Sequence, residues 1–380
     1  MASRSPPSSR YDEHDASVSA RVLIVDDSVV ARAVIARLID ASDHFSVVGA
    51  VGTANAALEF LGRAKVEFIL LDIEMPGVDG LTALPDLIAA GQGAKVLIVS
   101  SSTDEGGAAT VQALALGAAE TLVKPSAGAL SSRFGAALVA KLERLCENPA
   151  RLPPAVVVRA SPQTAPKTQP SAVVERTTRA SKAATALHDD YDIVAIGAST
   201  GGIHALNQMF RELPAGFRLP IVITQHLPTS FMPYFAAQIA LLAGRPCEVA
   251  TDSLRIRPGR IVIAPGDAHL KCVALGDGGA AFRLTQEPVA SGCMPSVDPM
   301  LASMAEVFGR RLLAIVLSGM GRDGAEGARR VHEHGGYVIA QDQASSVVWG
   351  MPGAVAASGV ADAVLPPDAI GRLVATRRRP

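Results

Sequence analysis

The sequence of 380 residues has little cysteine and no C-x-x-C pair. Its four cysteines lie far apart along the chain: Cys146, Cys247, Cys272 and Cys293. Such spacing argues against a zinc-binding or disulfide framework. It fits a reducing compartment, so we expect a cytoplasmic protein in which all four thiols are packing residues.

Long apolar runs and an excess of charge of one sign are also missing. No run approaches the roughly 20 apolar residues needed to cross a bilayer, and residues 1–20 lack the apolar centre of a secretory signal. We therefore expect a soluble monomer that does not insert into membranes, with a disordered tail over residues 1–20. The formal net charge of -1 gives no overall attraction for nucleic acid.

Short Val/Ile/Leu runs alternate with helix-like segments in two separate parts of the chain. Runs that are apolar on both faces are typical of parallel strands covered by helices on both sides. Residues 21–145 and residues 191–376 therefore predict two doubly wound α/β domains, the second with a hairpin-like stretch over residues 259–286. The stretch between them, residues 146–190, is rich in Pro, Ser and Thr and is typical of a flexible linker.

Acidic residues follow two of the strands expected in the first domain. Asp26 and Asp27 end the segment VLIVDD, and Asp72 ends the segment ILLD. One acid alone is as well explained by a solvated strand end, but three carboxylates crowded together need a hard cation, most naturally Mg²⁺. Ser100 and Lys124 end two later strands and offer a hydroxyl and an ammonium to phosphoryl oxygens.

This set of residues resembles a response-regulator receiver domain, a flavodoxin-like fold, over residues 21–145. The resemblance implies a role for each of the five residues: phosphorylation for Asp72, Mg²⁺ binding for Asp26, Asp27 and Asp72, and switching and phosphate contact for Ser100 and Lys124. Thr121 stands where many receivers carry an aromatic residue. The resemblance therefore does not extend to the usual aromatic gate.

The loop IGASTGG, residues 196–202, follows a strand-like run in the second domain. It lacks the spacing and the distant acid of a dinucleotide fingerprint and the Gly-Lys ending of a phosphate-binding loop. It matches G-x-S-x-G, a strand-turn-helix elbow that would expose Ser199. A serine nucleophile needs a base and an orienting carboxylate. His226 follows the next strand, and Asp323 follows the later strand RLLAIVLSG.

Each of these residues also has a purely structural explanation. A lone histidine such as His226 is usually structural, and Asp323 is well placed to cap the helix that it begins. All three candidates nevertheless lie at strand-to-helix junctions, where a triad in the chain order Ser, His, Asp can form. Ordinary α/β-hydrolases have the order Ser, Asp, His. The backbone N–H groups of Thr200 and Met320 are candidate donors to an oxyanion.

Six segments resemble the catalytic domain of the chemotaxis protein-glutamate methylesterases (the CheB family): IGASTGG, ITQHLP, IAPGDAHL, PSVD, LSGMGRDGAEG and AQDQASSVVWGMPGAV. With the receiver in front, the resemblance covers nearly all of the chain except the tail and the linker. It implies a Rossmann-like α/β domain in which Ser199 is the nucleophile, His226 the general base and acid, and Asp323 the carboxylate that orients His226. The segment Ser291–Met294 replaces basic residues that the family often carries there.

The resemblance also implies the reaction and the partners. The substrates would be γ-glutamyl methyl esters of methyl-accepting chemotaxis receptors, with deamidation of receptor glutamines as a second reaction and no cofactor for either. A histidine kinase would supply the phosphoryl group. We hypothesise that the unphosphorylated receiver blocks the catalytic edge and that phosphorylation shifts the population away from that state.

Three alternatives stay open beside this interpretation. The first is a receiver-controlled serine hydrolase that acts on another protein substrate. The second is a transcriptional regulator, which would need a helix-turn-helix and a basic face, whereas the second half offers sheet motifs and no strong positive excess. The third is a nucleotide-binding enzyme, which the IGASTGG loop disfavours.

Overall fold

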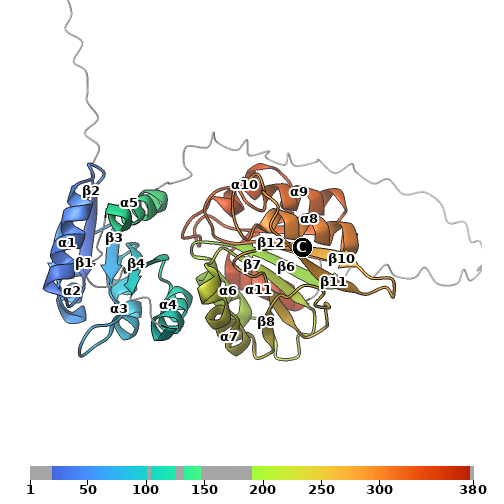
Figure 1. Cartoon of the computed structure of the whole chain (residues 1–380), viewed down its shortest axis with the longest axis horizontal. Coiled ribbons are helices and arrows are strands. Elements are labelled where there is room, and N and C mark those ends of the chain that lie inside the picture. The colour runs from blue at the N-terminus through green and yellow to red at the C-terminus, as the bar shows by residue number, and fades with distance from the viewer. Residues whose placement is uncertain (1–18, 101–103, 125–131, 147–190, 377–380) are drawn as a thin grey trace, which may run out of the picture. The chain divides into compact units, whose positions relative to one another are not determined.

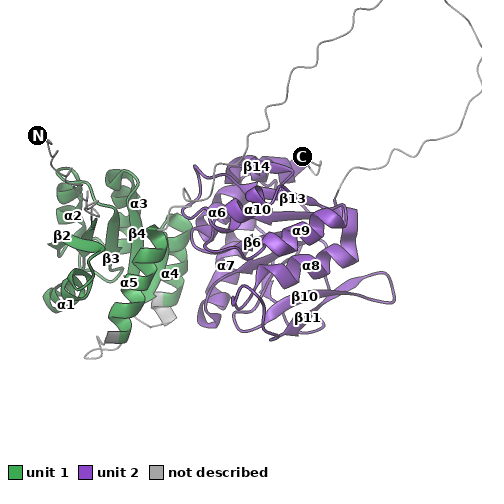
Figure 2. Cartoon of the chain, turned by 90° about the horizontal axis from the view of Figure 1, so that it is seen from above, with its two compact units in different colours: residues 1–147 green, residues 148–380 purple. Residues whose placement is uncertain are grey.

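The computed structural model describes most of the chain, namely residues 19–100, 104–124, 132–146 and 191–376. Two compact units are distinguished in Figure 2, Met1–Glu147 and Asn148–Pro380. Residues 1–18 of the expected tail and 147–190 of the expected linker lie outside the described residues.

The first unit contains a five-stranded parallel sheet in the order β2-β1-β3-β4-β5 (Figure 1). Its strands are β1 (Ala20–Val25), β2 (Phe45–Val51), β3 (Phe68–Leu71), β4 (Lys95–Ser100) and β5 (Glu120–Val123). Its helices are α1 (Val29–Asp40), α2 (Ala54–Leu61), α3 (Gly80–Gly91), α4 (Asp104–Leu116) and α5 (Ser132–Cys146). The inner strands β1, β3 and β4 are buried along most of their length, which explains their continuous apolar sequences.

Side-chain caps fix the starts of the first three helices. Ser28, Thr53 and Asp79 each accept a hydrogen bond from the backbone N–H three residues later. The cap at Ser28 ends the loop after β1 and leaves Asp26 and Asp27 between the strand and α1. The first helix therefore starts directly beyond the acidic residues.

The second unit contains a seven-stranded parallel sheet in the order β14-β13-β12-β6-β7-β9-β8. Its strands are β6 (Ile193–Ala198), β7 (Ile221–Gln225), β8 (Cys247–Val249), β9 (Ile261–Ile263), β12 (Leu312–Val316), β13 (Tyr337–Gln341) and β14 (Ala363–Leu365). Its α-helices are α6 (Gly202–Arg211), α7 (Met232–Ala243), α8 (Val297–Phe308), α9 (Ala325–Glu333), α10 (Met351–Ala357) and α11 (Pro367–Thr376). The prediction of two doubly wound parallel sheets is confirmed.

The insertion in the second unit is an antiparallel hairpin of β10 (His269–Ala274) and β11 (Ala280–Thr285). It forms a sheet of its own, and Leu270 and Phe282 pack in one hydrophobic core with Met300 and Met304 of α8. The sequence suggested one hairpin-like stretch over residues 259–286. The structure divides that stretch, because β9 joins the parallel sheet and only β10 and β11 form the hairpin.

Strand β6 lies at the centre of the second sheet, between β7 and β12. The chain leaves β6 toward β7 on one side and later returns to β12 on the other. This reversal makes a crevice at the carboxyl ends of the strands, which is where ligands bind in open α/β sheets. Ser199 follows β6, and His226 follows β7, so both emerge at this edge.

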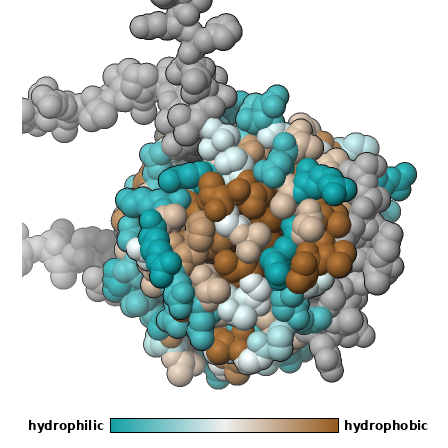
Figure 3. Space-filling model, turned by 90° about the vertical axis from the view of Figure 1, so that its left-hand side faces the viewer, coloured by the Kyte–Doolittle hydropathy of each residue, from teal (hydrophilic) through white to brown (hydrophobic). Residues whose placement is uncertain are grey.

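Apolar side chains also reach the surface of the first unit. Val29 and Val30, at the start of α1, are 69% and 71% exposed. The face seen from the left of Figure 1 carries hydrophobic residues within a hydrophilic rim (Figure 3). Among the described residues, no helix is long and apolar enough to cross a membrane.

Substitution of Gly197, in β6, tests how tightly the sheet packs on α8. A Cβ at this position would lie 2.4 Å from Cγ1 of Val297, a fully buried and β-branched side chain with little freedom to move. We expect Gly197→Ala to lower the free energy of unfolding by about 1–3 kcal/mol, the usual cost of overpacking. Urea denaturation of the full chain measures this change.

The control is Gly216→Ala, because a Cβ at Gly216 has no atom within 4 Å and the backbone there has no positive φ. We expect this control to change stability by less than about 0.5 kcal/mol. Equal stability of the two variants would show that the contact between Gly197 and Val297 is not tight.

Candidate functional site

The structure brings the three predicted acids of the first unit together. The register of β1 with β3 places Val25 opposite Leu71, so Asp26 and Asp72 emerge side by side. Ligand oxygens of Asp26, Asp27 and Asp72 lie within 4.8 Å of one another. Oxygen donors of this kind suit Mg²⁺, so the donor set fits the metal that the sequence predicts.

Lys124 supplies positive charge to the same pocket. Its Nζ lies 2.6 Å from Asp72 Oδ2 and 2.8 Å from Asp26 Oδ2. Burial raises the pKa of Asp72, and the hydrogen bond from Lys124 offsets part of that rise. Burial alone would lower the pKa of Lys124, but its bonds to Asp26 and Asp72 outweigh this effect and raise the pKa.

The predicted switch residues lie on the neighbouring strands. Ser100 ends β4, and its buried hydroxyl lies 3.0 Å from the Thr110 hydroxyl of α4. Thr121, which stands where many receivers carry an aromatic residue, is half-buried on β5, and its N–H donates to the Glu120 carboxylate. The hydroxyl of Ser100 is therefore tied to a helix that begins after the β4 loop.

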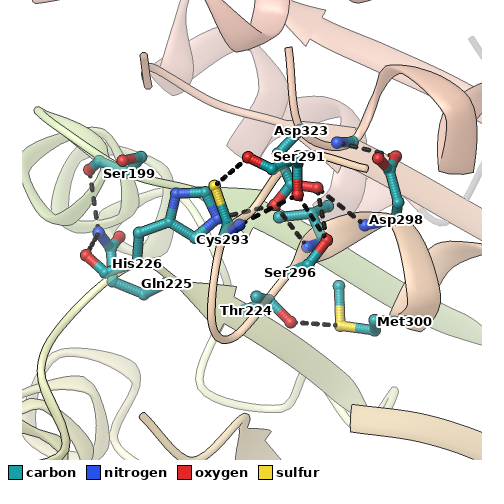
Figure 4. A network of polar contacts seen from close by, with 12 residues as sticks. Ser199, Thr224, Gln225, His226, Ser291, Cys293, Ser296, Asp298, Met300 and Asp323 are labelled. Atoms are coloured by element: carbon teal, nitrogen blue, oxygen red, sulfur yellow. Dashed lines mark hydrogen bonds and ion pairs between the residues drawn. The ribbon is translucent and has the colours of Figure 1, made fainter. Parts of the chain in front are cut away.

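In the second unit, His226 and Asp323 form a direct pair (Figure 4). Nε2 of His226 lies 2.8 Å from Oδ2 of Asp323. The His226 side chain is 17% exposed, whereas that of Asp323 is 1% exposed. The imidazole therefore has one edge toward solvent, and its partner is enclosed by protein.

Asp323 is held at the N-terminus of α8. Its Oδ1 accepts hydrogen bonds from the Ser296 hydroxyl at 2.6 Å and the Asp298 N–H at 3.3 Å, and its Oδ2 accepts one from the Val297 N–H at 2.8 Å. Charge-assisted bonds and the positive end of a helix both favour an ionised carboxylate. Asp323 therefore caps α8, although the sequence suggested a cap on the helix that follows Asp323.

The carboxylate of Asp298 caps the N-terminus of α9 in the same way. Its Oδ1 accepts hydrogen bonds from the N–H groups of Gly324 at 2.9 Å and Gly327 at 2.7 Å. Each of the two adjoining helices is therefore capped by a residue near the start of the other. Asp323, just before α9, caps α8, and Asp298, in the first turn of α8, caps α9. This exchange fixes the loop that carries Asp323.

The surroundings of Asp323, Asp298 and His226 shift the pKa of each of these three groups. Burial raises the pKa of Asp323, but its bonds with His226 and Ser296 outweigh this and lower the pKa to about 2. Burial, with the nearby Asp323 charge, raises the pKa of Asp298 to about 6. Burial lowers the pKa of His226, but its interactions with Asp323 and Cys293 outweigh this and raise the pKa to about 9. Because this value lies above 6.5, the raised pKa of His226 contributes stability that is fully present below pH 6.5 and is lost as the pH rises through about 9. The lowered pKa of Asp323 contributes stability that is fully present above pH 3.8 and is lost as the pH falls through about 2.

Ser199 lies beside His226 through the pairing of β6 with β7. The register places Ala198 opposite Gln225, so the next residues, Ser199 and His226, follow neighbouring strand ends. Gln225 Nε2 donates to the Ser199 carbonyl at 2.9 Å. In Figure 4 the His226 ring lies between Ser199 and Asp323.

Glycines form the elbow around Ser199. Gly201 has a φ of +77°, and a Cβ there would lie 2.5 Å from the Val347 Cβ. A Cβ at Gly319 would lie 2.8 Å from the Ser199 Cβ, so the loop after β12 passes close to the serine. Both positions require glycine for steric reasons.

The candidate oxyanion donors flank this elbow. Thr200 is buried and Met320 is half-buried. The Gly319 N–H donates to the Val348 carbonyl at 3.0 Å, and the Ser199 N–H donates to the Ser318 carbonyl at 3.0 Å. These two neighbouring N–H groups are therefore occupied within the fold.

The sequence did not predict that Cys293 belongs to this site. Ligand atoms of His226, Cys293 and Asp323 lie within 4.8 Å of one another. All four thiols are free, but the expectation that all are packing residues is wrong, because Cys293 adjoins His226 and Cys146 is exposed. The position of Cys293 just before PSVD was the available signal.

Each of the two compact units matches a known protein family. Residues 194–374 match the family model described as CheB methylesterase, and residues 22–133 match the response regulator receiver domain. The protein-glutamate methylesterase/protein-glutamine glutaminase 1 of Paramagnetospirillum magneticum is 41% identical, with 92% of this chain and 94% of that protein covered. The protein of the same name from Rhodospirillum rubrum is 40% identical, with 94% and 95% covered. The crystal structure of the Thermotoga maritima CheB methylesterase catalytic domain is 38% identical with a TM-score of 0.47, and it covers 49% of this chain and 98% of its own.

The titration of His226 tests whether Asp323 controls the imidazole. We expect a pKa of about 9 in the unchanged chain. In Asp323→Asn the pKa should fall to 6.5 or below, because burial then acts without the opposing carboxylate. The ring proton shifts of His226, followed by NMR across this pH range, give both values.

Asp368→Asn is the matched control, because Asp368 is an exposed acid that pairs with Arg372 on α11. It should leave the His226 titration unchanged. A His226 pKa near 6.5 in the unchanged chain, or one that Asp323→Asn does not lower, contradicts this description of the pair.

Proposed function

Because the chain belongs to the protein-glutamate methylesterase/protein-glutamine glutaminase family, with a receiver domain followed by a CheB methylesterase domain, we propose that it hydrolyses γ-glutamyl methyl esters of chemoreceptors. Phosphorylation of its receiver regulates this activity during chemotaxis adaptation. The observation that carries the proposal is the His226–Asp323 pair at 2.8 Å, beside Ser199 at the edge of one sheet.

Ser199 is the nucleophile in this proposal, and His226 is its base. Asp323, with a pKa of about 2, is ionised and accepts the Nε2–H of His226. The neutral ring then carries its proton on Nε2 and has Nδ1 available to accept a proton from the Ser199 hydroxyl. Asp323 thus selects the tautomer and stabilises the imidazolium that forms.

The ester reaction proceeds in two stages. Ser199 Oγ attacks the γ-carbonyl carbon, and His226 passes the serine proton to the departing methanol. Water then attacks the acyl-enzyme, with His226 as its base, and frees the glutamate and Ser199. The N–H groups of Thr200 and Met320 are the proposed oxyanion donors, and one such donor contributes about 10² to 10³ in rate in other hydrolases.

The same groups serve glutamine deamidation. The attacked carbon is again a γ-carbonyl carbon, and the leaving group is ammonia in place of methanol. His226 must protonate the departing nitrogen, so this reaction depends on its acid role more strongly. We propose deamidation as the second activity, with no cofactor for either reaction.

In the receiver, Asp72 is the proposed phosphorylation site, with a histidine kinase as phosphodonor. Asp26, Asp27 and Asp72 would hold Mg²⁺, which supplies positive charge to the incoming phosphoryl group. Lys124, within 2.8 Å of two of these carboxylates, is placed to contact phosphoryl oxygens, and Ser100 is the proposed switch hydroxyl. We assign the receiver to residues 21–145, the linker to residues 146–190 and the catalytic domain to residues 191–376.

A receiver-controlled hydrolase of another protein substrate is the second candidate. The observation that favours it is the uncharged segment Ser291–Met294, which adjoins the site through Cys293. A basic segment would attract acidic receptor helices, whereas this one offers Met294, which is 41% exposed. Both candidates place the reaction in the cytoplasm and use the same triad.

Replacement of Ser199 tests the proposed chemistry. Ser199→Ala should reduce methanol release from a methylated receptor fragment by at least about 10⁴-fold, because the acyl-enzyme cannot form. Phosphorylation of Asp72 should be unchanged, since Asp72 belongs to the other compact unit. Methanol release and phosphoryl incorporation from a small phosphodonor measure the two effects.

Ser230→Ala is the matched control, because Ser230 is an exposed serine in the short 3-10 helix Thr229–Phe231. This variant should retain methanol release. Retained release in Ser199→Ala would remove Ser199 from the mechanism. Release of methanol from another methylated protein, but not from a receptor fragment, would favour the second candidate.

A further inference from the structure

Cys293 gives the catalytic edge a set of ligands that ester hydrolysis does not need. Its thiol, the His226 imidazole and the Asp323 carboxylate each offer one ligand atom, and these atoms lie within 4.8 Å of one another. Figure 4 shows the Cys293 sulfur next to the His226 ring. The three side chains come from three different loops, after β7, before α8 and before α9.

The chemistry of this set differs from that of the receiver pocket. Thiolate and imidazole ligands favour zinc-like divalent ions, whereas three carboxylates favour Mg²⁺. One sulfur, one nitrogen and one oxygen ligand also leave the fourth position of a tetrahedral ion open. Among the described residues, two groups of side chains could thus hold a cation, one suited to a thiophilic ion and the other to Mg²⁺.

Small movements of the His226, Asp323 and Cys293 side chains would bring their ligand atoms to the spacing of a metal site. His226 Nε2 and Asp323 Oδ2 lie 2.8 Å apart, and ligands of one tetrahedral zinc ion are roughly 3.3–3.8 Å apart, given bond lengths of about 2.0–2.3 Å. The Cys293 sulfur makes a long contact, 3.7 Å, with the Ser291 carbonyl, and the thiol also interacts with the His226 imidazole. Asp323 keeps its bonds from Ser296 and Val297, which would orient it as a ligand.

We propose that Cys293, His226 and Asp323 form an inhibitory site for a thiophilic divalent cation of the Zn²⁺ type. This inference rests on the proposed function, since it adds a form of regulation to the same site. Binding would release two protons to solvent, the thiol proton of Cys293 and the proton on Nε2 of His226. The ring would then keep its remaining proton on Nδ1, so that His226 could not accept the proton of Ser199.

Cobalt is a direct probe of this site, because Co²⁺–thiolate bonds absorb in the near ultraviolet and Co²⁺–carboxylate bonds do not. The full chain, stripped of metals and supplied with excess Mg²⁺ for the receiver, should develop this absorption at one equivalent of Co²⁺. Cys293→Ser and Cys293→Ala should lose it. Cys247→Ser is the control, because burial raises the pKa of Cys247 to about 12 and so disfavours its thiolate.

Inhibition provides the second readout. Equimolar Zn²⁺ should reduce methanol release by at least about tenfold in the full chain, and Cys293→Ser should weaken this inhibition about 10- to 100-fold, the range found for residues that support a metal site. Each variant is compared with itself without Zn²⁺. Inhibition that is equally strong in Cys293→Ser would overturn the proposal.

Ser199→Ala separates this inference from the proposed function. It should keep the Co²⁺ absorption while it loses methanol release. If the unchanged chain releases methanol but shows no thiolate absorption, the metal site fails alone. If the absorption depends on Cys293 but no variant releases methanol, the proposed function fails and the metal site stands.

Discussion

The site in the second unit depends on one interaction, the burial of the Asp323 carboxylate among hydrogen-bond donors. An isolated carboxylate with 1% exposure would be strongly destabilising, yet this one accepts bonds from His226, Ser296 and two backbone N–H groups at the start of α8. The positive end of the helix and the short hydrogen bonds offset the desolvation and hold the carboxylate ionised. Its second oxygen then fixes the imidazole. Stability and site geometry are therefore properties of the same contacts.

Both units place buried carboxylates near the carboxyl ends of a parallel sheet, and both must compensate the negative charge. Parallel strands deliver side chains to their carboxyl ends, where the strand register decides which residues meet. In the first unit, Lys124 compensates the charge of Asp26 and Asp72. In the second unit, a helix N-terminus compensates the charge of Asp323. The carboxylates of Asp26 and Asp72 are buried, with 2% and 6% of their side chains exposed, and so is that of Asp323, with 1% exposed. The two units therefore differ in the source of the compensating positive charge and not in the depth of burial.

The local sequence was sufficient to predict the strands of both sheets and several of the residues that meet at the strand ends. Continuous apolar runs predict parallel strands, and strand ends then place Asp72 beside Asp26 and Ser199 beside His226. The position of Asp323 was also predictable, but its partners were not. Asp is a common cap for its own helix, and only the packing of α8 against α9 makes Asp323 cap the other helix while Asp298 caps α9. Cys293 was missed for the same reason, because a loop position has no periodicity that indicates its neighbours.

We propose that Asp323 positions His226 to activate Ser199. The most direct measurement is the pH dependence of covalent labelling by a fluorophosphonate, with the modified residue identified by mass spectrometry. We expect one adduct, on Ser199, that forms faster as the pH rises through about 9, where His226 becomes neutral. The variant His226→Gln should suppress this adduct. Labelling of a different residue, or labelling of Ser199 at a rate that does not depend on His226, would contradict it.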